Sequence, residues 1–271
     1  MPELPEVEEV RRGLEAAVMG GEIVAIAVRR RDYVRPGAAV FAQLRGRRLV
    51  STHRHGKKLF ITVDDGKTLH VHLGMSGRVD IVPATEPVAV HTHVILTLKD
   101  GRDVRFRDPR RFGEVVFYPT FRGAIEGETG GLGPDALGVT GGQLGGWRGA
   151  KGYLKQRLLG QKDIAGLGNI YVDEALWMCG LHPRQRVGRI REDKLGELVL
   201  AIREVLEKSI ASGGTTLRDY RNVSNQPGAF KLQLQAYGRG GEACRRCGKV
   251  MQEGQVAGRT TVWCAGCQKK R

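Results

Sequence analysis

The sequence predicts an α+β fold divided over several domains, and three observations support that prediction. Residues 1–122 combine one amphipathic helix with short β-strand patterns separated by turn residues. Residues 150–235 carry helical periodicity, and residues 236–271 hold four of the five cysteines in two close pairs. A chain of 271 residues is long enough for more than one core. We therefore expect an N-terminal helix with an antiparallel β-sandwich, then a helical domain, then a small cysteine-rich ribbon.

The charge balance is strongly basic, with 44 Lys and Arg residues against 29 Asp and Glu and a net charge of +15. This balance is typical of a protein that binds a polyanion, and it favours nucleic acid as the partner. Ribosomal proteins and nucleases share such a charge, so it does not separate them. No basic amphipathic helix favours a membrane surface, and no apolar run is long enough to span one. The N-terminus also lacks the charged segment followed by an apolar segment that is typical of a signal peptide. We therefore expect cytoplasmic residence and no membrane partner.

The first twenty residues predict an amphipathic helix that begins with a reactive group. Removal of the initiator Met, which is common before a small residue, leaves Pro2 with a free secondary amine beside Glu3 and about one turn before Glu6. The positive end of a helix dipole lowers the pKa of an α-amine from roughly 7.7–8.0, so more of it is neutral and nucleophilic. The alternative is an ordinary helix with acidic capping. The apolar face consists of Val7, Val10, Leu14, Ala17 and Val18.

Short strand patterns follow up to residue 118 and predict an antiparallel sandwich or barrel. Turn residues join two pairs of them as hairpins, Asp64-Asp65-Gly66 in the first and Asp100-Gly101 in the second. No phosphate-binding glycine motif of the nucleotide-cofactor folds is present, so such a cofactor is not supported. The strand patterns cover residues 23–28, 59–63, 68–73, 94–98, 104–106 and 115–118.

Three loops between these strands carry residues suited to a DNA groove. Residues 55–58 offer two lysines beside a glycine, residues 72–77 place Met75 between glycines, and residues 107–113 combine arginines with Phe112. Taken singly, they also fit a solvated lysine pair, a core methionine and a surface turn. Together, in a basic domain, they favour insertion into DNA, where apolar wedges unstack bases and Arg reads an exposed base edge.

The second half of the chain begins with a Gly-rich stretch, residues 123–149, that predicts a domain linker. Helical patterns then start near Leu154 and Asn169, and the clearest covers residues 195–210. Asn169 follows a glycine-punctuated turn, which suits either a phosphate cradle or a simple helix cap. Residues 219–229 are polar and predict a mobile loop, either a functional lid or a long connection.

The C-terminal cysteines form two Cys-x-x-Cys pairs that stand sixteen residues apart. This spacing predicts one Zn²⁺ held by four thiolates, with the segment between the pairs as a β-hairpin. Two disulfides are the alternative, and a cytoplasmic protein disfavours them. Four protein ligands leave no open position, so the zinc is expected to be structural. The ligands are Cys244, Cys247, Cys264 and Cys267.

These motifs together resemble the bacterial formamidopyrimidine-DNA glycosylase family over essentially the whole chain. The resemblance is carried, in order, by PELPEVE, HLGMSG, DPRRFG, GLGNIY, GGTTLRDY and GRTTVWC. It implies a catalytic β-sandwich over residues 1–122, the linker, a helix–two-turn–helix DNA-binding domain over 150–235 and a zinc ribbon over 236–271. The implied partner is damaged double-stranded DNA, bound by a monomer. The related endonuclease VIII branch, which prefers oxidised pyrimidines, and a non-catalytic DNA-binding zinc-ribbon protein are the alternatives.

The resemblance also implies a reaction and the residues that perform it. An oxidised purine such as 8-oxoguanine or a formamidopyrimidine is everted and removed, and the strand is nicked by β,δ-elimination. Pro2 attacks C1′ and forms a Schiff base, Glu3 supplies a proton to the opening sugar, and Glu6 supports the site. Lys57 assists base loss and strand cleavage, while Arg259 at the ribbon tip holds the phosphate during elimination.

The remaining implied residues contact DNA. Met75, Arg110 and Phe112 fill the gap left by the everted base, and Arg110 faces the orphaned cytosine. Residues 219–229 resemble the loop that folds over an everted 8-oxoguanine. The chain departs from the family at Lys58, where an apolar or aromatic residue is usual, and at Arg218, where Lys is common. The implied phosphate contacts are His72, His91, Lys151, Lys155 and Asn169, and Arg218 joins the DNA-binding set.

Overall fold

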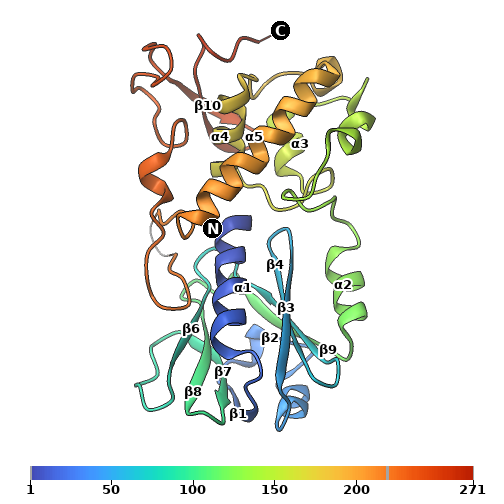
Figure 1. The fold of residues 1–271 in the computed structure, drawn as a ribbon, viewed down its shortest axis with the longest axis vertical. Helices are drawn as coiled ribbons and strands as arrows, with labels where there is room; N and C mark the ends of the chain where they lie inside the picture. Colours follow the sequence, from blue (N-terminus) through green and yellow to red (C-terminus); the bar gives the residue numbers. More distant parts are fainter. Residues whose placement is uncertain (1, 218–219, 271) are drawn as a thin grey trace. The chain divides into compact units, whose positions relative to one another are not determined.

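The structure, a computed structural model, describes residues 2–217 and 220–270 and divides into two compact units (Figure 1). Unit 1 comprises Met1–Gly131 and Ser212–Ala229, and unit 2 comprises Leu132–Ala211 and Phe230–Arg271. This division differs from the predicted boundaries in two ways. The chain returns to unit 1 after the long helix that ends at Ala211, and the ribbon packs with the helices into one unit instead of standing alone.

Unit 1 is built around helix α1, Leu4–Val18, whose apolar stripe is buried as its periodicity predicts. A reciprocal capping box closes its N-terminus: the Glu3 side chain accepts from the backbone of Glu6, and Glu6 Oε2 accepts from Glu3 N at 2.8 Å. The helix contacts β3 and β4 of one sheet and β6 of the other. It therefore packs on both layers of the sandwich at once.

The sandwich consists of a four-stranded sheet in the order β1-β7-β8-β6 and a five-stranded sheet in the order β2-β9-β5-β4-β3. All neighbouring strands are antiparallel except the two-residue β2, which pairs parallel with β9. The prediction of an antiparallel sandwich is thus confirmed. The strands are β1 (Ile23–Val28), β2 (Val34–Arg35), β3 (Leu49–His55), β4 (Lys58–Val63), β5 (Thr68–His72), β6 (Arg78–Pro83), β7 (Thr92–Leu98), β8 (Arg102–Arg107) and β9 (Glu114–Tyr118).

Three strands and one helix of unit 1 were not predicted from the sequence. Strand β2 has only two residues and β3 consists mostly of polar residues, whereas β6 alternates polar and apolar residues over Arg78–Ile81 but was not predicted. Helix α2, Phe121–Thr129, begins the stretch predicted as a linker, and its Thr120 cap accepts from Gly123 N at 3.1 Å. It packs on β4, β5 and β9. The linker over residues 123–149 is therefore partly helical. Short 3₁₀ turns complete both units at Arg31–Tyr33, Ala38–Leu44, Gly141–Trp147, Val187–Arg189 and Phe230–Gln233.

Unit 2 contains the predicted helices α3 (Leu154–Leu159), α4 (Asn169–Cys179) and α5 (Glu192–Ala211). Helix α4 packs on both α3 and α5 and ends at Gly180, whose φ of 70° is the left-handed conformation that favours glycine. The ribbon hairpin, β10 (Gln252–Val256) and β11 (Arg259–Trp263), packs against α4. The buried Glu174 fixes the chain before the ribbon, because its carboxylate accepts from the backbone N–H groups of residues 235, 236 and 237, each at 2.8 Å.

The described part of the polar segment 219–229 is anchored on unit 1. Tyr220 and Val223 belong to its hydrophobic core, and Val223 O accepts from Ile81 N at 3.2 Å. A side chain at Gly13 of α1 would collide with Val223, since an added Cβ lies 2.3 Å from Val223 Cγ2. Tyr220 and Val223 are two apolar residues in a polar stretch, and this pattern is too weak to predict from the sequence that the segment packs on the core. In the described part of the chain, no helix has the length and apolarity to cross a bilayer.

Candidate functional site

The residues at the start of α1 are buried together. Pro2 is buried, and Glu3 and Glu6 are 3 % and 1 % exposed. Glu6 is held from two directions, because Oε2 accepts from Glu3 N and Oε1 accepts from Thr215 N at 2.7 Å. A carboxylate that binds two backbone N–H groups is fixed in place and offsets part of its desolvation cost.

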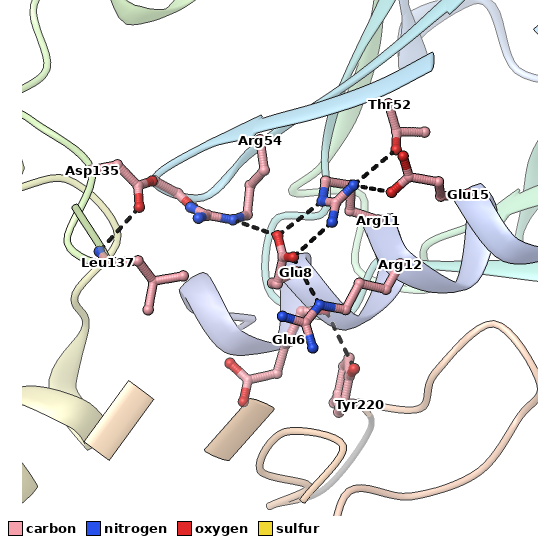
Figure 2. A network of polar contacts seen from close by, with 11 residues as sticks. Glu6, Glu8, Arg11, Arg12, Glu15, Thr52, Arg54, Asp135, Leu137 and Tyr220 are labelled. Carbon is pink, nitrogen blue, oxygen red and sulfur yellow. Dashed lines mark hydrogen bonds and ion pairs between the residues drawn. The ribbon is translucent and has the colours of Figure 1, made fainter. Parts of the chain in front are cut away.

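The segment after α5 supplies the support for Glu6. Gly214 has a φ of 84°, and an added Cβ would lie 3.2 Å from Glu6 Oε1. Tyr220 Oη donates to the backbone O of Glu6 at 3.3 Å (Figure 2). Gly214, the second of the two glycines that end the predicted helix near residue 210, thus also leaves room for the Glu6 carboxylate. No pattern in the sequence indicates this second role.

Lys57 lies in the two-residue turn between β3 and β4. His55 pairs with Lys58 across the hairpin, and Gly56 has a φ of 57°, as required at the first position of a tight hairpin turn. Arg54 Nη1 donates to Gly56 O at 2.9 Å and fixes the turn from the strand side. The side chain of Lys57 is half-buried.

The neighbouring Lys58, the point of departure from the family pattern, is committed to an ion pair. Its Nζ lies 2.8 Å from Oε2 of Glu128 at the end of α2. Glu128 Oε1 also accepts from Tyr118 Oη at 2.8 Å and lies 3.1 Å from His70 Nδ1. The close contact with His70 and the hydrogen bonds from Lys58 and Tyr118 hold the pKa of Glu128 well below its usual range, so the carboxylate stays charged. Lys58 therefore anchors α2, and the geometry leaves Lys57 as the candidate reactive lysine.

The loops that carry Met75 and Arg110 are joined through a fully buried carboxylate, Asp108. Its Oδ1 accepts from Ser76 Oγ at 2.6 Å and from Arg110 N at 3.2 Å, while Oδ2 accepts from Gly113 N at 2.8 Å. Ser76 Oγ also accepts from Arg110 N at 3.1 Å. One side chain thus organises both loops. Sequence reasoning missed it, although an aspartate before proline is a turn signal.

The same two loops touch at a glycine. Gly74 has a φ of 59°, and an added Cβ would lie 2.4 Å from both Gly113 N and the carbonyl carbon of Phe112. The large side chains beside this contact face solvent, with Met75 39 % and Phe112 54 % exposed. The Arg110 guanidinium lies over the Phe112 ring, 5.0 Å from its centre. The structure therefore brings the three predicted wedge residues together on two loops that contact each other, and we call these loops the wedge platform.

Two histidines of unit 1 complete the predicted contacts there. His72 ends β5, and burial together with the nearby Lys58 and His70 lowers its pKa, which favours the neutral ring. His91 is exposed, has a φ of 65°, and its carbonyl accepts from Asp108 N at 3.0 Å. The wedge platform thus contacts the backbone of His91.

Four residues predicted to contact phosphates lie in unit 2, namely Lys151, Lys155, Asn169 and Arg259. Lys151 and Arg259 are exposed, and Arg259 follows the two-residue turn of the ribbon hairpin. Asn169 does not cap its helix, because that position belongs to Gly168 and the Asn169 amide donates to Thr260 O at 2.9 Å. The simple-cap interpretation is wrong. Asn169 instead ties the start of α4 to the residue after Arg259.

The four predicted metal ligands come together. Their Sγ atoms all lie within 4.8 Å of one another, with Cys244 and Cys267 4.0 Å apart and Cys247 and Cys264 3.4 Å apart. A tetrahedrally coordinated ion with metal–sulfur bonds of about 2.3 Å requires S···S separations of about 3.8 Å. The four cysteines therefore fit a tetrahedral metal ion. Trp177 Nε1 of α4 donates to Cys244 Sγ at 3.5 Å, which links this cluster to the helices.

Comparison with known proteins places this geometry in a family. The Formamidopyrimidine-DNA glycosylase N-terminal domain matches residues 1–115, and the Formamidopyrimidine-DNA glycosylase H2TH domain matches residues 146–221. The chain belongs to the formamidopyrimidine-DNA glycosylase family. It is 37 % identical to the Formamidopyrimidine-DNA glycosylase of Shewanella woodyi over the full length of both chains. It is 39 % identical to that of Xanthomonas campestris pv. campestris, over 99 % of this chain and 100 % of the relative.

Solved structures of the family agree with the fold. A mutant of the Lactococcus lactis FPG in complex with a Fapy-dG containing DNA superposes with a TM-score of 0.92 at 32 % identity. The Lactococcus lactis Fpg in complex with an abasic site containing DNA also gives 0.92 at 32 % identity. Each covers 99 % of this chain and 100 % of the relative. The α+β fold with its helix–two-turn–helix domain and cysteine ribbon is confirmed.

One residue implied by the family resemblance, Lys155, does not lie where a phosphate could reach it. Its side chain is 0 % exposed, and Nζ lies 2.6 Å from Asp173 Oδ1 and 3.3 Å from Thr260 O. Asp173 Oδ2 accepts from Val262 N at 3.1 Å. Burial raises the pKa of Asp173 above its usual range, and Lys155 opposes that rise. We therefore revise Lys155 from a phosphate contact to an internal cation that joins α3, α4 and β11. Arg218, also in the predicted DNA-binding set, lies outside the described residues.

Replacing Lys155 is expected to destabilise unit 2 instead of removing one phosphate contact. Lys155→Ala leaves Asp173 buried without its cation, which costs about 3–5 kcal/mol in the free energy of unfolding. Urea unfolding measures this loss, with Lys151→Ala, at an exposed lysine of the same segment, as the control. The double variant Lys155→Met with Asp173→Leu removes both charges and should recover most of the stability. If that stable double variant lost DNA affinity as Lys151→Ala does, the revised role would be wrong.

Proposed function

We propose that this protein is a bifunctional DNA glycosylase and abasic-site lyase that removes oxidised purines from duplex DNA. The observation that carries the proposal is the start of α1, where Pro2, Glu3 and Glu6 are buried together at a helix N-terminus. Two acidic residues are otherwise costly to bury, and here the arrangement places them next to a potential nucleophile. The Lactococcus lactis relatives that bind Fapy-dG and abasic-site DNA support the same substrate class.

The reaction starts at the Pro2 nitrogen once Met1 has been removed. The neutral secondary amine attacks C1′ of the damaged nucleotide, the glycosidic bond breaks, and the base leaves with a proton. Glu3 supplies a proton to the sugar oxygen as the ring opens, and the resulting iminium joins C1′ to Pro2. The iminium draws electrons from C2′, so loss of a C2′ proton expels the 3′ phosphate. A second elimination expels the 5′ phosphate.

Other residues position the DNA for these steps. A base within a duplex is out of reach, so it must be everted and the gap filled. Met75 and Phe112 are exposed apolar side chains suited to the gap, and Arg110 provides donors for the orphaned cytosine. Lys57 assists base loss and cleavage. His72, His91, Lys151, Asn169 and Arg259 supply phosphate contacts, Arg259 during elimination.

We propose Zn²⁺ as the ion of the cysteine cluster. Four thiolates in tetrahedral reach suit Zn²⁺, and with no fifth ligand position the ion is structural. Bound by Cys244, Cys247, Cys264 and Cys267, it would cross-link the segments that flank the β10–β11 hairpin and so hold the hairpin, and with it Arg259, against α4. A monomeric state and a cytoplasmic location stay predictions.

Trapping with borohydride tests the proposed reaction. Borohydride reduces an iminium to a stable amine, so protein incubated with an 8-oxoguanine duplex should gain the mass of a DNA fragment. Tryptic mapping should place the link on the peptide that begins at Pro2. A preference for oxidised pyrimidines over 8-oxoguanine in this assay would favour the endonuclease VIII branch. The absence of any adduct, with intact DNA binding, would favour a non-catalytic DNA-binding protein.

Arg110→Ala is expected to flatten the preference for cytosine over adenine opposite 8-oxoguanine. A base-edge contact contributes about 1–3 kcal/mol to discrimination, so the ratio of excision rates should fall about 5- to 160-fold. Arg111→Ala is the matched control, since Arg111 is the exposed neighbour whose guanidinium lies 3.3 Å from Asp32. An unchanged ratio in Arg110→Ala assigns the reading to another residue.

A further inference from the structure

A buried carboxylate on α1 gathers three arginines that the proposed reaction does not use. Glu8 has a side chain only 8 % exposed, and its two oxygens accept from Arg11, Arg12 and Arg54 at 2.9–3.0 Å (Figure 2). Burial alone would raise the pKa of Glu8, but these hydrogen bonds outweigh it and lower the pKa to about 2. Glu8 is therefore charged at neutral pH.

Arg54 differs from the other two arginines because it lies on β3 and also contacts the turn that follows this strand. Its Nε lies 3.0 Å from Glu8 Oε2, and its Nη1 donates to Gly56 O at 2.9 Å. Its side chain is 7 % exposed, whereas that of Arg12 is 55 % exposed. The planar guanidinium holds these two contacts at a set separation, which a lysine ammonium cannot reproduce. Arg54 thus connects α1 with the turn that carries Lys57.

We propose that Arg54 is a positioning residue that sets the place of Lys57 relative to the start of α1. The inference rests on the proposed function, in which Pro2 and Lys57 act on the same nucleotide. Glu8 lies within the first turns of the helix that follows Pro2, and Gly56 directly precedes Lys57. A bridge between them therefore links the two reacting elements of unit 1. Displacing a reacting group by about 1 Å can cost roughly 100-fold in rate, so such a bridge matters for the reaction.

The test is Arg54→Lys, which keeps the charge but not the two-pronged contact. With enzyme in excess over an 8-oxoguanine duplex, we expect the single-turnover excision rate to fall about 10- to 100-fold. Affinity for a duplex with a non-cleavable abasic-site analogue should change less than about 3-fold. Arg12→Lys is the matched control, because Arg12 contacts the same Glu8 carboxylate from the exposed side of the helix. It should keep the wild-type rate.

A second background separates positioning from a general loss of structure. If Arg54 acts through Lys57, Arg54→Lys should change the rate little when Lys57→Ala is already present. Equal rate losses with and without Lys57, or a wild-type rate in Arg54→Lys, would overturn the inference. Should Arg54→Lys fold poorly, Glu8→Asp shortens the bridge by one methylene group and is expected to show the same dependence on Lys57. If the wild-type protein gives no borohydride adduct, the proposed function is wrong. If the wild-type protein gives the adduct but Arg54→Lys keeps the wild-type rate, only the inference about Arg54 is wrong.

Discussion

A protein with one glycine inserted between Met1 and Pro2 should bind lesion DNA but give no borohydride adduct and no strand cleavage. In the insertion variant the Pro2 nitrogen is part of a tertiary amide, whose lone pair is delocalised into the carbonyl and is not nucleophilic. The only free α-amine is then displaced by at least one residue from the start of α1, away from the position at which Pro2 acts. Every side chain is preserved, including the exposed Arg110 and the Asn169 amide that meets Thr260 O. The loss should therefore fall on chemistry and not on recognition.

The measurement compares adduct formation, cleavage and affinity for a non-cleavable abasic-site duplex in the two proteins. The same glycine added at the C-terminus is the control for the insertion and should change nothing. Pro2→Gly is a weaker test, because it keeps a primary amine that can still form an iminium. Undiminished cleavage by the extended protein, or an adduct mapped to Lys57 or Lys58, would show that Pro2 is not the nucleophile.

Cys244→Ser is the second change with a large expected effect. Cys244 is 2 % exposed and packs with Trp177, Met251 and Val262 in the small apolar cluster between the ribbon and α4. That cluster is too small to hold the ribbon alone, and a structural Zn²⁺ contributes about 10–16 kcal/mol in comparable modules. We expect the variant to lose its metal, the ordered ribbon and its affinity for lesion DNA.

Tryptophan fluorescence can follow this change within unit 2. All three tryptophans, Trp147, Trp177 and Trp263, belong to unit 2, and Trp177 contacts Cys244 Sγ. Their emission should shift towards that of exposed indole, while the far-ultraviolet β-sheet signal of unit 1 persists. The control is Cys179→Ser, which changes the fifth cysteine, outside the four-cysteine cluster. A metal-free Cys244→Ser protein with full DNA affinity would rule out a structural role for the ion.

Local patterns in the sequence were enough to predict most elements. The apolar spacing of α1 and α5, the glycine turns of the β4–β5 and β7–β8 hairpins, and the cysteine pairs of the ribbon all appear where they were expected. Each of these signals lies within a few residues of the structure it predicts. Strand β3 was missed because most of its residues are polar and give no local signal, whereas β6 alternates polar and apolar residues and its signal was not used.

The sequence by itself determined the family, the sandwich and ribbon architecture, and which loops carry Met75, Arg110 and Lys57. Only the tertiary structure decided which charged residues face solvent. Lysine is usually a surface residue, but Lys155 is buried, because Asp173 and Thr260 approach it from distant parts of the chain. Asp108 and Arg54 likewise gained their roles from partners in other loops and on another helix. The environment of a buried charge depends on partners that folding brings together, and no periodicity in the sequence records them.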